Sequence, residues 1–156
     1  MSVLEIVRDF PGDLQFVFDF VTRNENLVQW WCPPGVTLAE NDLDFTREGP
    51  WWFVLVDPNG GRHRVEGLVD HIDPPKAVEF SMTIRSNSTG EITQDTRVRF
   101  ELAAAGPDQT TFRLIQTGLR PEEIVPVREL GWAKPMAALE ALVHEHHTRG
   151  SGETHA

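Results

Sequence analysis

The sequence predicts an α+β domain in which a few helices pack against an antiparallel sheet. Apolar residues recur at helical spacing only at about residues 11–31 and 121–147. Between residues 36 and 118, apolar and polar residues alternate in short runs separated by turn sequences such as DPNGG, a pattern typical of antiparallel strands that follow one another. The predicted order is therefore one strand, two short helices, about six strands and one long helix.

Length and composition fit one globular domain. The chain has 156 residues, of which 40% are hydrophobic and 24% are charged, proportions that allow it to bury a core. We expect this domain to occupy residues 1–147 and to be followed by a disordered polar tail over 148–156. Cys32 is the only cysteine, so no disulfide can form within the chain, and a cytoplasmic location is the simplest expectation.

The charge and hydropathy patterns exclude two classes of partner. A formal net charge of −10 opposes binding to nucleic acid or to anionic lipid, because both attract positively charged surfaces. No apolar run reaches the roughly 18 residues expected of a membrane-spanning helix. We therefore expect a small neutral ligand or another protein as partner, with neither nucleic acid nor membrane.

The first strand is predicted over residues 3–10 and is followed by two short helices. Residues 14–21 carry apolar side chains at positions i, i+3, i+4 and i+7, which form one helical face. Asn24 can cap a second short helix, and Pro33 stops it. This second helix ends with two adjacent tryptophans, in a chain that has five tryptophans and no tyrosine.

The long C-terminal helix is predicted from an apolar stripe that contains a proline. Trp132, Met136, Leu139 and Val143 follow one another at steps of four, three and four residues. Pro135 lies within this stripe and lacks a backbone N–H, so we expect a bend or an opened turn near residues 131–135.

Four segments in this order also resemble a known family. They are LVQWWCPPG after the second helix, GPWWFVLVDPNG on a hairpin, VDHIDPPKAVEF across the next turn, and LIQTGL with EEIVPVRELGW before the last helix. Together they resemble the bacterial homologues of the activator of the heat-shock-protein-90 ATPase, which belong to the START-related, Bet v 1-like (SRPBCC) superfamily. The resemblance covers roughly residues 3–145.

The resemblance implies a helix-grip fold. In this fold a curved antiparallel sheet of about six to seven strands wraps around the long C-terminal helix and leaves a cavity between them. The paired tryptophans would then cap one end of the sheet, with one ring in the core and the other near the cavity or the surface.

A cavity in this place would be lined by the inward faces of the strands and of the last helix. The alternative is that the same side chains simply fill the core. His71, by alternation with Val69, and Gln116, by alternation with Leu114, are the polar positions expected to face inward. Each could orient a ligand or act only as a structural hydrogen bonder. The predicted cavity residues are Trp31, Trp51, Phe53, His71, Phe80, Met82, Phe100, Phe112, Gln116, Trp132 and Met136.

The hairpin strand departs from the family pattern in a way that predicts an interface. Positions that commonly carry charge in the family read Trp52 and Val56 in this chain. With Val54 between them, they would form an apolar outward face, and the simplest cover for such a face is a second copy of the chain. The predicted interface therefore consists of Trp52, Val54 and Val56, in a homodimer.

Candidate catalytic and metal-binding residues are few. Cys32 sits at the predicted C-terminal end of a helix, where nothing lowers its pKa, and inert packing is expected. His144 and His147 supply two ligands, whereas zinc sites use three or four, so no metal or other cofactor is predicted. Asp70 and His71 are adjacent in a predicted strand and should face opposite sides, which does not favour an acid–base pair.

Three functions are consistent with these observations. The first is non-enzymatic binding of a small hydrophobic or aromatic molecule in the cavity. The second, implied by the family name, is association with a chaperone. The third is a cyclase-, aromatase- or hydrolase-like enzyme that uses the same cavity, with His71 as general base and Gln116 beside it. Fold alone does not choose among them, because function depends on the site.

Overall fold

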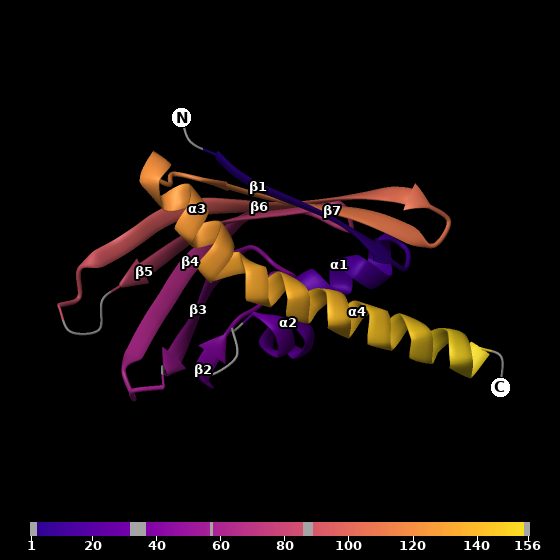
Figure 1. The fold of residues 1–156 in the computed structure, drawn as a ribbon, viewed down its shortest axis with the longest axis horizontal. Coiled ribbons are helices and arrows are strands. Elements are labelled where there is room, and N and C mark those ends of the chain that lie inside the picture. Colours follow the sequence, from indigo (N-terminus) through magenta and orange to yellow (C-terminus); the bar gives the residue numbers. More distant parts are fainter. Residues whose placement is uncertain (1–2, 32–36, 57, 86–88, 155–156) are drawn as a thin grey trace.

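The computed structural model describes residues 3–31, 37–56, 58–85 and 89–154. A seven-stranded antiparallel sheet curves around a long C-terminal helix, and two short helices follow the first strand (Figure 1). The strands are ordered β1-β7-β6-β5-β4-β3-β2. The predicted α+β class and helix-grip arrangement are thus confirmed.

The sheet is built from strands of 6 to 15 residues, and register shifts interrupt several of the strand pairs. Their bounds are β1 Val3–Pro11, β2 Thr37–Asp42, β3 Gly49–Val56, β4 Arg62–Asp73, β5 Ala77–Arg85, β6 Ile92–Gly106 and β7 Gln109–Thr117. The helices are α1 Leu14–Thr22, α2 Asn24–Trp30, a short 3-10 turn Pro121–Glu123, α3 Ile124–Pro126, a π-helical segment Val127–Trp132 and α4 Ala133–Thr154. Among the described residues no helix is long and apolar enough to cross a membrane.

Alternation along the strands separates a buried inner face from a charged outer face. In β7, the side chains of Phe112, Leu114 and Gln116 are buried, while Arg113 between them is exposed. This period of two is the one predicted from the sequence, and it turns the apolar side of the sheet toward the helices.

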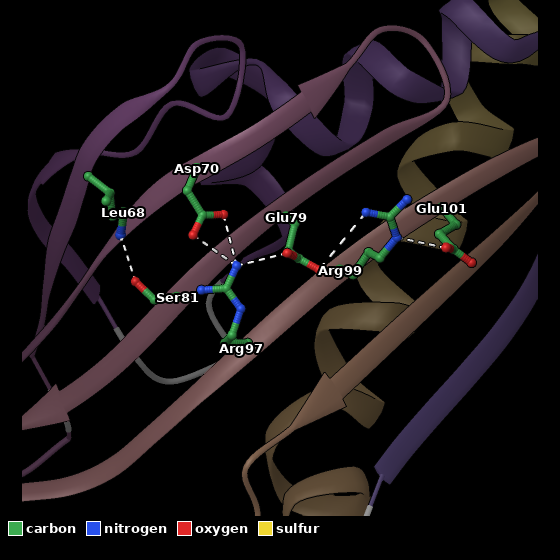
Figure 2. A network of polar contacts seen from close by, with 7 residues as sticks. All are labelled: Leu68, Asp70, Glu79, Ser81, Arg97, Arg99 and Glu101. Atoms are coloured by element: carbon green, nitrogen blue, oxygen red, sulfur yellow. Dashed lines mark hydrogen bonds and ion pairs between the residues drawn. The ribbon is translucent and has the colours of Figure 1, made fainter.

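The outer face of the sheet carries a row of ion pairs. Arg97 donates hydrogen bonds at 2.8 Å to both Asp70 and Glu79, and Arg99 bonds Glu101 at 2.7 Å (Figure 2). The hydrogen bond from Arg97 lowers the pKa of Asp70 below its ordinary value. These side chains are about one-third to one-half exposed, so the pairs add little stability, and their main effect is to keep this face polar.

The two short helices and α4 form the layer that covers the inner face. Asp13 caps α1 by accepting a hydrogen bond from the Phe16 N–H at 2.9 Å. Trp30 at the end of α2 is fully buried, and its indole N–H donates to the carbonyl of Phe20 at 2.8 Å. Figure 1 shows α4 crossing the concave side of the sheet, with α1 and α2 close to its middle.

The predicted irregularity before α4 is present as the π-helical segment. The N–H of Ala133 bonds the carbonyl of Arg128, five residues back, instead of four. Pro135 has no N–H to give to the carbonyl of Gly131, which explains why the regular α pattern does not extend backward through this turn. The helix itself continues to Thr154, and the domain boundary expected at residue 147 stays a prediction.

Gly67 lies where the backbone of a neighbouring strand and a tryptophan ring approach β4 closely. It lies in β4 opposite Trp51 of β3. A Cβ atom at this position would collide with the carbonyl oxygen of Ser81 and lie 2.8 Å from Nε1 of Trp51. Only glycine therefore lets β4 and β5 approach each other with the Trp51 ring in place.

Replacement of this glycine tests the packing of the inner face. We expect Gly67→Ala to lower the free energy of unfolding by about 1–3 kcal/mol, because the backbone of β5 and the Trp51 ring must shift. Gly106→Ala is the matched control, since the atom nearest to its added Cβ would lie 3.9 Å away. Urea unfolding followed by far-ultraviolet circular dichroism measures both. Equal midpoints for the two variants would contradict the close approach.

Candidate ligand pocket

A pocket of about 430 Å³ lies between the inner face of the sheet and the segment that leads into α4. One wall comes from β3, β4, β5 and β6, another from the end of α3 and the π-helical segment, and Trp31 lies at the end next to α2. The lining residues are Trp31, Phe53, Leu55, Val65, Met82, Ile84, Gln94, Pro126, Val127, Gly131 and Trp132.

The lining is apolar and uncharged. Of these described lining residues none is titratable, and Gln94 carries the only polar side chain apart from the two indole rings. The ring of Trp31 stands perpendicular to that of Trp132, with centroids 5.7 Å apart, and meets Phe53 edge-on at 6.1 Å. Such walls favour aromatic or alicyclic ligands and give no stabilisation to a charged group.

Hydrogen-bonded side chains of Trp132, Gln116, Thr96 and Gln94 form a relay directly behind the pocket wall. Gln116 is fully buried, and its Oε1 accepts a hydrogen bond from the Trp132 indole N–H at 2.9 Å. Its Nε2 donates to Oγ1 of Thr96 at 2.8 Å and to Oε1 of Gln94 at 3.3 Å. The relay fixes the Trp132 ring, which forms part of the lining, and ends at Gln94, which is itself a lining residue.

The predicted cavity residues divide into lining and core. Trp31, Phe53, Met82 and Trp132 line the pocket. Gln116 faces inward as predicted but sits behind Trp132, with its hydrogen bonds made inside the protein. The remaining apolar members are at most 1% exposed and fill the core beside the pocket: Trp51, Phe80, Phe100, Phe112 and Met136.

The inward orientation predicted for His71 is wrong. His71 is exposed, and it pairs with Glu79 across a register shift that follows Val69. The bulge inserts one extra residue and reverses the alternation, so that Ile72 lies opposite the buried Val78 instead. His71 therefore does not reach the pocket.

The predicted apolar outer face of β3 is more covered than its sequence indicates. Val54 is only 8% exposed within one chain and so offers little surface of its own to a partner. Trp52 and Val56 are half-buried, and the guanidinium of Arg64 lies over the Trp52 ring, 4.8 Å from its centroid. Arg64 pairs with Val54 across the hairpin, which explains how one long side chain covers this strip. A dimer contact here stays a prediction.

Several lining residues were missed by the sequence prediction, and only some had a signal. Gln94 lies on the same face of β6 as Thr96 and Val98 and opposite Ile84 of β5, so alternation extended backward could have found it. Pro126 of α3 and the π-helical residues Val127 and Gly131 had no such signal, because their direction depends on where the regular helix begins. The missed residues are Leu55, Val65, Gln94, Pro126, Val127 and Gly131, whereas Ile84 belongs to the inward face that alternation predicts for its strand.

The other candidate groups lie away from the pocket. Cys32, considered above as a thiol, lies outside the described residues. Nε2 of His147 is 2.6 Å from a carboxylate oxygen of Asp108, and His144 is exposed. Over the part of the chain that the structure describes, no group of three or more histidine, cysteine, aspartate or glutamate side chains is placed to hold a metal ion.

Comparisons with known proteins agree with this fold. The profile of the family described as "Activator of Hsp90 ATPase homolog 1-like protein" matches residues 14–144. The crystal structure of the AHSA1 protein from Silicibacter pomeroyi is 29% identical, with a TM-score of 0.82, and the match covers 93% of this chain and 99% of that one. No curated protein matches the sequence significantly.

Two more distant structures show the fold alone. A crystal structure of a protein from Chromobacterium violaceum has 16% identity and a TM-score of 0.74, over 92% of this chain and 98% of that one. A solution structure from Arthrobacter aurescens has 22% identity and a TM-score of 0.71, over 92% and 86%.

The relay behind the pocket makes a prediction about stability. We expect Gln116→Met to lower the free energy of unfolding by about 1–3 kcal/mol, since it leaves the Trp132 N–H without its acceptor in a buried place. Gln109→Met is the control, because Gln109 is exposed on the same strand. Chemical unfolding measures both changes. If the Gln116→Met protein were as stable as the control, the relay would make no measurable contribution to the free energy of unfolding.

Proposed function

Since this chain belongs to the family of Activator of Hsp90 ATPase homolog 1-like proteins, we propose that it binds a small hydrophobic or aromatic molecule between the sheet and its last helix. The binding is non-enzymatic, and the ligand occupies the pocket bounded by Trp31, Met82 and Trp132. The single observation that carries the proposal is an uncharged cavity of about 430 Å³ between the sheet and the segment that leads into α4.

The size and chemistry of the pocket support this function. Pockets for small molecules are usually about 300–1,000 Å³, mostly apolar, with a few polar groups that orient the ligand. Here the apolar walls come from four strands and one helical segment, and Gln94 supplies the polar group. The hydrophobic effect would supply most of the binding free energy, and the perpendicular rings of Trp31 and Trp132 favour a flat ligand.

The enzymatic alternative lacks a general base in the pocket. It depended on His71, which lies on the exposed side of β4 behind the bulge. General acid–base catalysis requires a titratable group within hydrogen-bonding distance of the substrate, and the described lining contains none. Binding without chemistry is therefore the simpler proposal.

A chaperone partner is the second candidate, and the family description is the observation in its favour. The description names an activator of the Hsp90 ATPase, and an outer surface of this chain would make the contact. A reducing cytoplasm suits both candidates, because the chain has one cysteine. Purified cognate chaperone tests the second candidate: co-sedimentation supports it, and an unchanged ATPase rate with no complex contradicts it.

Self-association through the strip Trp52 and Val56 would be compatible with either function. The two side chains are half-buried, so a partner copy would complete their cover. The pocket lies on the opposite face of the sheet and would stay accessible in such a dimer, because Phe53 and Leu55 between them point into it.

Filling the pocket tests the proposed function. The neutral fluorophore N-phenyl-naphthylamine should bind the native protein, with a rise in its emission on entering an apolar site. Ile84→Trp places a larger side chain in the pocket, so we expect at least about a 10-fold loss of affinity, equal to the loss of about 1.4 kcal/mol of binding free energy.

The control places the same new side chain outside the pocket. Ile92 pairs with Arg85, the residue that follows Ile84, but it is 51% exposed and does not line the cavity, so Ile92→Trp is the control. We expect this variant to bind the fluorophore as the native protein does. Equal affinities for the two variants would place the fluorophore elsewhere and contradict the proposal.

A further inference from the structure

The hydrogen bonds behind the pocket can run in only one direction. An indole N–H is a donor and never an acceptor, so the Gln116 atom that faces Trp132 must be the oxygen. The amide nitrogen of Gln116 is then the atom that faces Thr96 and Gln94. Because that nitrogen can only donate, Gln94 must present its own oxygen to it.

This direction determines which half of the Gln94 amide is left for the pocket. Its Oε1 is engaged by Gln116 at 3.3 Å, whereas its NH₂ group has no hydrogen-bond partner among the described residues. Gln94 is half-buried and lines the cavity. A donor that loses water when a ligand enters must be matched by an acceptor on that ligand, or binding is weakened.

We infer that the ligand carries a neutral hydrogen-bond acceptor, such as a ketone oxygen, which meets the Gln94 NH₂ group while an aromatic or alicyclic body fills the apolar part. This inference rests on the proposed function. A neutral acceptor is favoured over a carboxylate because no cationic side chain occurs among the lining residues, and a buried anion without a partner is costly. Gln94 would thus determine specificity, and Trp132 and Gln116 would set its direction.

A pair of probes that differ in one oxygen tests this inference. Fluorenone and fluorene have the same ring skeleton, but only fluorenone has a carbonyl group. We expect the native protein to bind fluorenone about 3- to 10-fold more tightly, as one additional neutral hydrogen bond predicts. Quenching of the intrinsic tryptophan fluorescence measures both affinities, because Trp31 and Trp132 line the pocket.

Variants of Gln94 separate the donor from the rest of the relay. Gln94→Met keeps the length of the side chain without the donor, and Gln94→Glu keeps an oxygen for Gln116 while replacing the NH₂ group. Neither variant should prefer fluorenone. Gln94→Met should bind the two probes equally, with a fluorene affinity within about twofold of native, as expected for a swap that conserves volume. The carboxylate of Gln94→Glu offers fluorenone no donor and repels its carbonyl oxygen. Gln109→Met, on the exposed part of β7, should keep the native preference for fluorenone.

The outcomes distinguish this inference from the proposed function. Equal binding of both probes by the native protein overturns the inference and leaves the pocket as a site. A preference for fluorenone that persists in both Gln94 variants assigns the donor to another residue and also overturns it. Binding of neither probe contradicts the proposed function itself, and the inference with it.

Discussion

The packing of one indole ring holds the layers of this protein together. The ring of Trp31 lies within 5.4–6.3 Å, centroid to centroid, of six other aromatic rings. These rings belong to α2, to the segment before β3, to β3 and β5, and to the turn that leads into α4: Trp30, Phe45, Trp51, Phe53, Phe80 and Trp132. Because close-packed interiors transmit displacement, the sheet, the short helices and the start of α4 cannot move independently at this end. The pocket lies next to this cluster, where Trp31 and Trp132 are shared by core and cavity.

Local sequence patterns predict the sheet and its two faces well. Alternation placed Met82 and Gln116 on the inner face, and both are buried there. The helical spacing around Trp132 and the disruption expected from Pro135 both correspond to the observed π-helical segment and α4. The predicted inward orientation of His71 is wrong because a bulge adds one residue to one strand. No residue type at this position indicates the bulge.

The division between core and cavity could not be predicted, because it is a tertiary property. Phe80 and Met82 lie on the same face of the same strand, yet Phe80 packs in the core and Met82 lines the pocket. The difference depends on where the segment that leads into α4 lies over the sheet, because its residues form the facing wall of the pocket. The role of Gln94 could not be predicted for the same reason, because it depends on the tertiary contacts that bring Gln116 and Trp132 next to it. Family resemblance supplied the overall arrangement that local patterns leave open.

Two methionines report directly on whether a small molecule binds in the pocket. Met82 lines the pocket, whereas Met136 is 1% exposed and lies outside the lining. The most direct measurement is a titration of the protein, labelled with carbon-13 at its methionine methyl groups, with N-phenyl-naphthylamine. We expect the Met82 methyl resonance to shift and saturate in step with fluorophore emission, while the Met136 resonance moves much less. A Met82 resonance that stays in place while the fluorophore binds would show that the fluorophore does not occupy this pocket.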